Sequence, residues 1–213
     1  MAYLIAGRTR ARSQAIQLLF QAQVQDIDVF DLLAGGVYAL EDGPLDPFGE
    51  ELARGVAVNR ISIERMLDNI SRMWSYARMP MVDRCIMSVA LFEMFCQDET
   101  PVSVAINEAV ELAKAYAGDD SSAFVNGILG NVAKLAEAEP GISLAALANR
   151  VAEQNAPTKA AEAAAVAEAL GMQQEPEEVE EDLEEYEGLA VDEEDFPEDI
   201  EEDCDPESDD SVE

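Results

Sequence analysis

Apolar residues recur every three or four positions over most of the first 139 residues, which is the spacing of one face of a helix. Residues 11–22 show the pattern clearly, because alanine and leucine return there at helical intervals. No stretch shows the period-two alternation of Val, Ile and aromatic residues that a half-buried strand would give. The pattern therefore predicts an all-α body.

The periodicity places the expected helices with some detail. They cover about residues 9–25, 48–58, 62–71, 82–96, 103–117 and 120–135, with a weaker one over 29–40 that Gly35-Gly36 interrupts. Short polar side chains give the expected N-caps: Thr9 or Ser13, Ser62, Ser103, and Asp120 or Ser121. Beyond its first turn, segment 82–96 is apolar nearly all round, which predicts a central, buried helix.

Composition changes after Pro140-Gly141. Residues 142–170 are rich in alanine and predict one or two helical stretches split at Asn155-Ala156-Pro157. A weak apolar face there either packs on the body or leaves the segment loosely helical. Residues 175–213 contain 23 Asp/Glu and no Lys or Arg, which predicts a disordered acidic tail. The expected organisation is a helical domain over 1–139, an extension over 140–174 and the tail over 175–213.

Charge is unevenly distributed along the chain. Residues 1–139 hold 11 Lys/Arg and 20 Asp/Glu, a net charge of −9, whereas the whole chain has a net charge of −33. Such a chain repels nucleic acids and anionic membranes in bulk, so any RNA binding must depend on a local basic patch. Because no 18-residue apolar run and no signal-peptide pattern is present, and cysteines are few, we expect a cytoplasmic protein without a membrane partner.

The residues also argue against catalysis. Histidine is absent, and there is no CxxC pair, phosphate-binding loop or dinucleotide-binding glycine motif. We therefore expect no enzyme activity, no catalytic residues, no metal site and no cofactor. A hydrolase with two carboxylates remains a formal alternative, but no pair of acidic residues stands out by its spacing.

Three blocks together resemble the NusB family of transcription antitermination factors. They read RTRARSQAIQLLFQ at 8–21, VDRCIMSVALFEM at 82–94, and VAINEAVELAK with FVNGIL within 104–129. The resemblance covers roughly residues 8–135 and implies two small helical bundles packed roughly perpendicular to each other.

The function that the resemblance implies is RNA binding. Members of the family bind boxA-type single-stranded RNA together with NusE, a ribosomal small-subunit protein. They act on the transcription elongation complex and promote processive transcription of rRNA operons. The alternative is a helical adaptor that binds protein without binding RNA.

The basic cluster lies at the start of the first helix, where positive charge opposes the helix dipole and therefore does not stabilise the helix. It consists of Arg8, Arg10 and Arg12. From the residues alone, a solvated arm with chance arginines is an adequate explanation. The resemblance instead implies that this arm contacts RNA, with Phe20 nearby at a position where the family commonly has tyrosine.

The turn between the last two body helices provides further RNA candidates. Lys114 and Tyr116 suit a surface role, and Asp120 is expected either to cap a helix or to accept from a base edge. The resemblance also implies that Asp83 and Arg84 contact the protein partner. Their plain alternative is a solvated first helical turn.

Three explanations of the acidic tail stay open. It can be a solubilising segment, it can fold back on the arginine cluster and compete with RNA, or it can dock on a basic partner.

Overall fold

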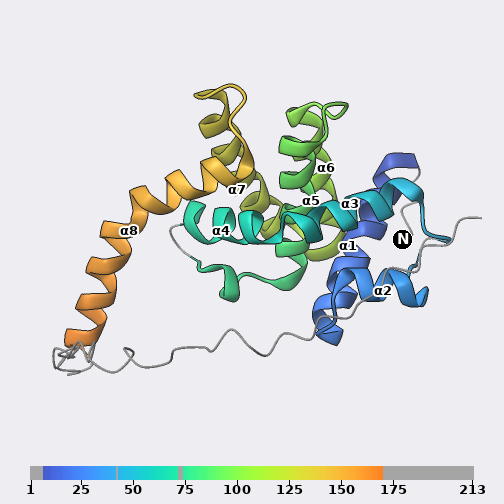
Figure 1. Ribbon diagram of the computed structural model, residues 1–213, viewed down its shortest axis with the longest axis horizontal. Helices are drawn as coiled ribbons and strands as arrows, with labels where there is room; N and C mark the ends of the chain where they lie inside the picture. Colours follow the sequence, from blue (N-terminus) through green and yellow to red (C-terminus); the bar gives the residue numbers. More distant parts are fainter. Residues whose placement is uncertain (1–6, 42, 72–73, 170–213) are drawn as a thin grey trace, which may run out of the picture. The chain divides into compact units, whose positions relative to one another are not determined.

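A computed structural model of the protein describes residues 7–41, 43–71 and 74–169 (Figure 1). Its elements are α1 (Gly7–Gln25), α2 (Val29–Gly35), α3 (Pro47–Val58), α4 (Arg60–Ile70), the short 3₁₀ turn η1 (Tyr76–Arg78), α5 (Met81–Cys96), α6 (Val102–Ala117), α7 (Asp119–Glu137) and α8 (Leu144–Ala169). None of these described residues forms a strand, so the predicted all-α fold is confirmed. The predicted acidic tail over 175–213 lies outside the described residues.

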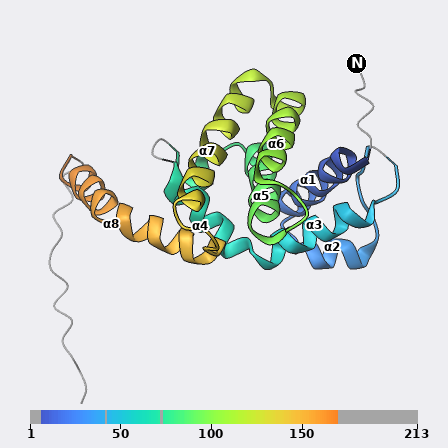
Figure 2. The same cartoon turned by 90° about the horizontal axis from the view of Figure 1, so that it is seen from above.

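The helices form two groups, which α5 joins. Helices α1, α2 and α3 form the first group, and α4, α5, α6 and α7 form the second. Helix α5 packs on α4, α6 and α7 of its own group and also on α1 and α3 of the first group. Figures 1 and 2 show α6 and α7 side by side, running steeply across the direction of α3 and α4. The predicted pair of crossed bundles is thereby confirmed.

The central position predicted for segment 82–96 is also confirmed. Apolar side chains all along α5 are buried, from Cys85 and Ile86 to Leu91 and Phe92. Two glycines let α3 approach closely. A Cβ at Gly55 would lie 2.0 Å from the Phe92 ring, and one at Gly49 would lie 2.7 Å from the carbonyl oxygen of Ala11. Side chains at these two positions would push α3 away from α5 and α1.

The expected N-caps are wrong, because each proposed residue lies inside its helix. Backbone geometry starts two of these helices instead. Pro101, with φ of −58°, precedes α6, and Gly118, with φ of +94°, precedes α7. Aspartates cap other helices: Asp28 accepts from the amide of Phe30, and Asp46 accepts from the amide of Phe48.

Helix α8 packs against α4, which decides between the two alternatives left open for residues 142–170. Leu147 is fully buried, and Leu144 and Val151 are nearly so. The helix continues through Pro157, so the predicted split at this residue is wrong. Anchors on both sides of Pro157 hold it: Asn155 Nδ2 donates to the carbonyl of Asn69 at 2.6 Å, and Lys159 Nζ to that of Asp68 at 3.2 Å. These bonds satisfy two of the last carbonyls of α4, which have no partner within their own helix.

Replacing Leu147 with alanine should lower the free energy of unfolding of the full chain by about 2–5 kcal/mol, because a cavity would form between α4 and α8. Val166→Ala is the matched control on the same helix, since Val166 is 58% exposed. Its effect should stay within about 0.5 kcal/mol in urea unfolding. Equal effects of the two changes would mean that α8 does not contribute to the core.

The contact between α8 and α4 should also depend on pH. Burial raises the pKa of Asp68, but hydrogen bonds from Lys159 and from the amide of Tyr76 outweigh burial, so the pKa is lowered from 3.8. A lowered folded-state pKa contributes stability that is present above the unfolded value and is lost as the pH falls through the folded value. The difference in unfolding free energy between wild type and Asp68→Asn should therefore shrink from pH 6 toward strongly acidic pH. A constant difference would contradict the assigned role of this carboxylate.

Candidate nucleic-acid interface

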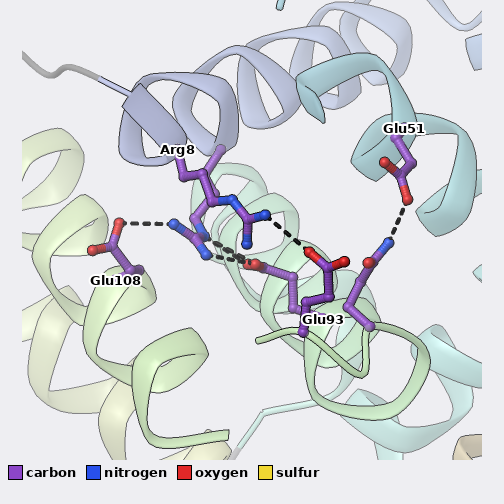
Figure 3. A network of polar contacts seen from close by, with 7 residues as sticks. Arg8, Glu51, Glu93 and Glu108 are labelled. Carbon is purple, nitrogen blue, oxygen red and sulfur yellow. Dashed lines mark hydrogen bonds and ion pairs between the residues drawn. The ribbon is translucent and has the colours of Figure 1, made fainter. Parts of the chain in front are cut away.

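Arg12 is buried and fully engaged with carboxylates, with only 4% of its surface exposed. Its Nε and Nη2 atoms donate to the two oxygens of Glu93 at 2.8 and 2.7 Å, and its Nη1 donates to Glu108 at 3.3 Å. Figure 3 labels these two glutamates together with Arg8. Burial alone would lower the pKa of Arg12, but the hydrogen bonds and charges of both carboxylates raise it. The arrangement joins α1 to α5 and α6. It leaves Arg12 inaccessible to a phosphate, which does not support the RNA contact expected for it.

The other two arginines of the cluster remain accessible. Arg8 is exposed, lies over the Phe48 ring at 5.0 Å, and pairs with the exposed Glu99 at 3.1 Å. Arg10 is half-buried and pairs with Asp46 at 3.5 Å. Surface pairs of this kind contribute about 0–1 kcal/mol, so a phosphate can replace either carboxylate at little cost.

Tyr116 lies against the same helix although it is far away in the sequence. Its hydroxyl accepts from Gln17 Nε2 at 2.9 Å and shares a 2.7 Å hydrogen bond with Ser13 Oγ. The side chain is 38% exposed, as is that of Phe20, which lies one turn beyond Gln17. The structure therefore places two partly exposed aromatic rings on or beside α1.

Lys114 and Asp120 lie at the turn between α6 and α7. The ammonium group of Lys114 is 3.5 Å from a carboxylate oxygen of Asp119, and both side chains are exposed. Asp120 is exposed in the first turn of α7, where its negative charge favours the helix dipole. Both residues are accessible to a ligand.

Asp83 is not the solvated residue that the plain alternative describes. It is 3% exposed and accepts a hydrogen bond from Ser121 Oγ, which ties the start of α5 to the start of α7. The same contact uses the hydroxyl of Ser121, one of the two residues predicted to cap α7. Arg84, the other residue expected to contact a protein partner, is half-buried, with its guanidinium 4.9 Å from the centre of the Tyr76 ring.

Sequence reasoning missed the residues that position α1. Gln14 holds the loop before α3, since its amide donates to the carbonyl of Pro44 at 2.9 Å and accepts from the amide of Asp46 at 2.8 Å. Glu93 could have been found, because it is a lone acidic residue in the apolar part of its helix. A buried charge in such a place requires a partner of opposite charge.

No group of three or more Cys, Asp or Glu side chains among the described residues could hold a metal ion. Among the described helices, none is both long and apolar enough to cross a membrane.

The buried cluster of Arg12, Glu93 and Glu108 should be sensitive to the loss of either main partner. Arg12→Gln should lower the free energy of unfolding by about 3–5 kcal/mol, because it leaves the carboxylate of Glu93 as an uncompensated buried charge. Glu93→Gln should lower it by a smaller amount, because Arg12 keeps its ion pair with Glu108. The exposed pair of Arg54 and Glu50, 2.9 Å apart, is the control, and removing Arg54 should cost less than about 1 kcal/mol. Urea unfolding measures the loss of unfolding free energy in the cluster variants and in the Arg54 control. Similar losses would show that the buried cluster stabilises the fold no more than an exposed ion pair does.

Comparison with known proteins finds relatives that match the helical body of the chain. Residues 9–134 match the model of the NusB family. The transcription antitermination protein NusB of Saccharopolyspora erythraea is 38% identical over 134 residues, covering 62% of this chain and 90% of the relative. The transcription antitermination protein NusB of Bacillus subtilis is 38% identical over 125 residues, covering 59% of this chain and 93% of the relative.

Solved structures show the same fold. The structure of T. maritima NusB aligns with a TM-score of 0.53 and 30% identity, over 62% of this chain and 93% of that one. A crystal structure of antitermination factors NusB and NusE in complex with double-stranded RNA aligns with a TM-score of 0.52 and 19% identity, over 60% and 96% of the two chains. Because the family model matches more than half of the sequence, from α1 to α7, the chain belongs to the NusB family.

Proposed function

We propose that this protein is an RNA-binding transcription antitermination factor. Its relatives are named transcription antitermination protein NusB, and one protein of the same fold was crystallised with NusE and double-stranded RNA. The observation that carries the proposal is the accessibility of Arg8 and Arg10 on α1, the helix that also carries Phe20 and contacts Tyr116, in a chain that is otherwise strongly acidic. In finer terms, we propose boxA-type single-stranded RNA of rRNA operons as the ligand, NusE as the protein partner, and the transcription elongation complex in the cytoplasm as the place of action.

The accessible residues suit different parts of an RNA strand. Arg8, Arg10 and Lys114 offer positive charge to phosphates. Tyr116 and Phe20 offer ring faces on which bases stack. Asp120 cannot hold a phosphate, but it can accept a hydrogen bond from an exocyclic amine of a base. In this proposal Arg12 has no contact with RNA and acts by holding α1 in place.

A protein adaptor without RNA binding is the second candidate function. The observation that favours it is that Arg8 and Arg10 each already have a carboxylate partner. The two candidates differ in one measurable property, the affinity for RNA in the presence of NusE.

Changing both Arg8 and Arg10 to glutamine should weaken binding of boxA-like single-stranded RNA to the complex of the full chain with NusE. The logarithm of affinity should also depend less steeply on the logarithm of salt concentration, by about 0.7 for each lost phosphate contact. Fluorescence titrations at several salt concentrations measure both effects.

The control for this test removes the same charge elsewhere. Arg54 and Arg65 are exposed on α3 and α4, so the Arg54→Gln/Arg65→Gln variant should keep the wild-type salt dependence. Equal losses in the two variants would mean that only net charge matters. Absence of RNA binding by the wild type with NusE would reject the proposed function in favour of the adaptor.

A further inference from the structure

The start of α3 lies against the two accessible arginines at the start of α1. The guanidinium of Arg8 lies 5.0 Å from the centre of the Phe48 ring, and Asp46, which precedes the helix, pairs with Arg10 at 3.5 Å. The amide of Phe48 donates to the other carboxylate oxygen of Asp46 at 3.0 Å. One short turn, Asp46-Pro47-Phe48, thus contacts both arginines to which the proposed function assigns RNA phosphates.

The carboxylates that pair with these two arginines differ in their freedom to move. Glu99 follows the end of α5 and has 79% of its side chain exposed, so it can turn into water when a phosphate binds Arg8. Asp46 is held from two directions. Its Oδ1 caps α3 by accepting from the amide of Phe48, and its own amide donates to Gln14 Oε1 at 2.8 Å. Because moving Asp46 would uncap α3 and break the contact with Gln14, its carboxylate stays in place when a ligand reaches Arg10.

Arg10 is only partly engaged by this carboxylate. Its Nη2 donates to Asp46 Oδ2 at the long distance of 3.5 Å, and its buried Nε has no hydrogen-bond partner in the described part of the chain. The buried Arg12 differs, because its Nε and Nη2 both donate to Glu93 at 2.8 and 2.7 Å. A guanidinium has five N–H donors, so the half-buried Arg10 can bind a phosphate while Asp46 remains beside it.

A phosphate on Arg10 creates a requirement at the neighbouring carboxylate. The fixed Oδ2 of Asp46 would lie near the negative oxygens of the phosphate, and like charges repel each other. A hydroxyl group that donates to Oδ2 offsets this repulsion, because hydrogen bonds to an ionised acceptor are among the strong ones. Every ribose of an RNA strand carries such a donor, the 2′-hydroxyl, close to a phosphate, whereas DNA lacks it. A DNA strand would therefore leave the repulsion by Asp46 uncompensated.

We propose that Asp46 is a specificity-determining residue, which accepts a hydrogen bond from a ribose 2′-hydroxyl beside the phosphate held by Arg10 and thereby selects RNA over single-stranded DNA. The inference rests on the proposed function, since it takes Arg10 as a phosphate contact. It adds a means of recognising the sugar. Positive charge and aromatic stacking do not provide one, because RNA and DNA share phosphates and bases.

The test compares two probes on the complex of the full chain with NusE. One is a boxA-like RNA strand, and the other is the same strand made of deoxyribonucleotides, with deoxyuridine in place of uridine, so that the probes differ only in the 2′-hydroxyls. Asp46→Asn keeps a capping oxygen for α3 but places an amide nitrogen, a donor, where Oδ2 stood. The ratio of RNA affinity to DNA affinity should fall about tenfold, as expected for the loss of a hydrogen bond to a charged group. DNA affinity should stay unchanged or rise, because a negative charge is removed.

Asp28→Asn is the matched control. Asp28 caps α2 as Asp46 caps α3, by accepting from the amide two residues later at 2.7 Å, but it follows the end of α1 that is opposite to Arg10. The ratio for this variant should stay within about twofold of wild type, because a change in net charge alone affects both strands alike. An unchanged ratio in Asp46→Asn would overturn the proposal. An equal gain in RNA and DNA affinity would also overturn it, because Asp46 would then act only through its charge.

RNA strands with a single 2′-deoxy nucleotide locate the contact. At one position, the missing hydroxyl should weaken binding by wild type about tenfold. The same strand should cost Asp46→Asn less than about twofold, because the acceptor of that hydroxyl is gone. If circular dichroism shows that Asp46→Asn does not fold, Asp46→Ser replaces it, since serine also caps helices but has no second oxygen. Equal costs in wild type and variant at every position would contradict the proposal.

The outcome also distinguishes this inference from the proposed function. If the wild-type complex binds the RNA and the deoxyribonucleotide strand equally well, only the role of Asp46 is rejected. If the wild-type complex binds neither strand, the proposed function is rejected together with it.

Discussion

The buried cluster of Arg12, Glu93 and Glu108 is the constraint on which the rest of the interface depends. A guanidinium in the protein interior must be paired, and here its partners lie 81 and 96 residues away on α5 and α6. Satisfying this one charge fixes the position of α1 relative to both helices. Ser13 and Gln17 then meet Tyr116, and Gln14 meets the loop before α3. The cluster therefore determines which arginines stay accessible to a ligand.

Helix α5 connects this constraint to the other contacts of the molecule. Along one largely apolar helix, Asp83 joins α7, Arg84 stacks on Tyr76 and Glu93 holds α1. The two paired residues are structural, whereas the buried Nε of Arg84, like that of Arg10, has no hydrogen-bond partner in the described chain. Helix α5 thus carries a contact to α7 at its start and a contact to α1 near its end.

The sequence was sufficient to predict features that follow from local patterns. The helical period, the buried character of segment 82–96 and the family resemblance all rest on neighbouring residues, and the structure or the comparisons confirm them. The predicted N-caps were wrong because hydroxyls such as those of Ser13 and Ser121 bond to distant side chains and not to the start of their own helix. The break at Pro157 failed because Asn155 and Lys159 anchor α8 to α4 on both sides of the proline. Burial of Arg12 depends on partners far away in the sequence, which no local pattern reveals.

We expect the carboxylate of Glu93 to support RNA binding by positioning α1, although its charge repels RNA. The affinity of Glu93→Gln for boxA-like RNA in the presence of NusE tests this claim, with Glu51→Gln as a control that removes an exposed carboxylate bonded to Gln97. The titration is made at a temperature where circular dichroism shows that both variants remain folded. If Glu93 acts by positioning α1, Glu93→Gln binds RNA more weakly and Glu51→Gln binds it unchanged or slightly more tightly. Tighter binding by Glu93→Gln would contradict this role, because the carboxylate would then act only through its charge.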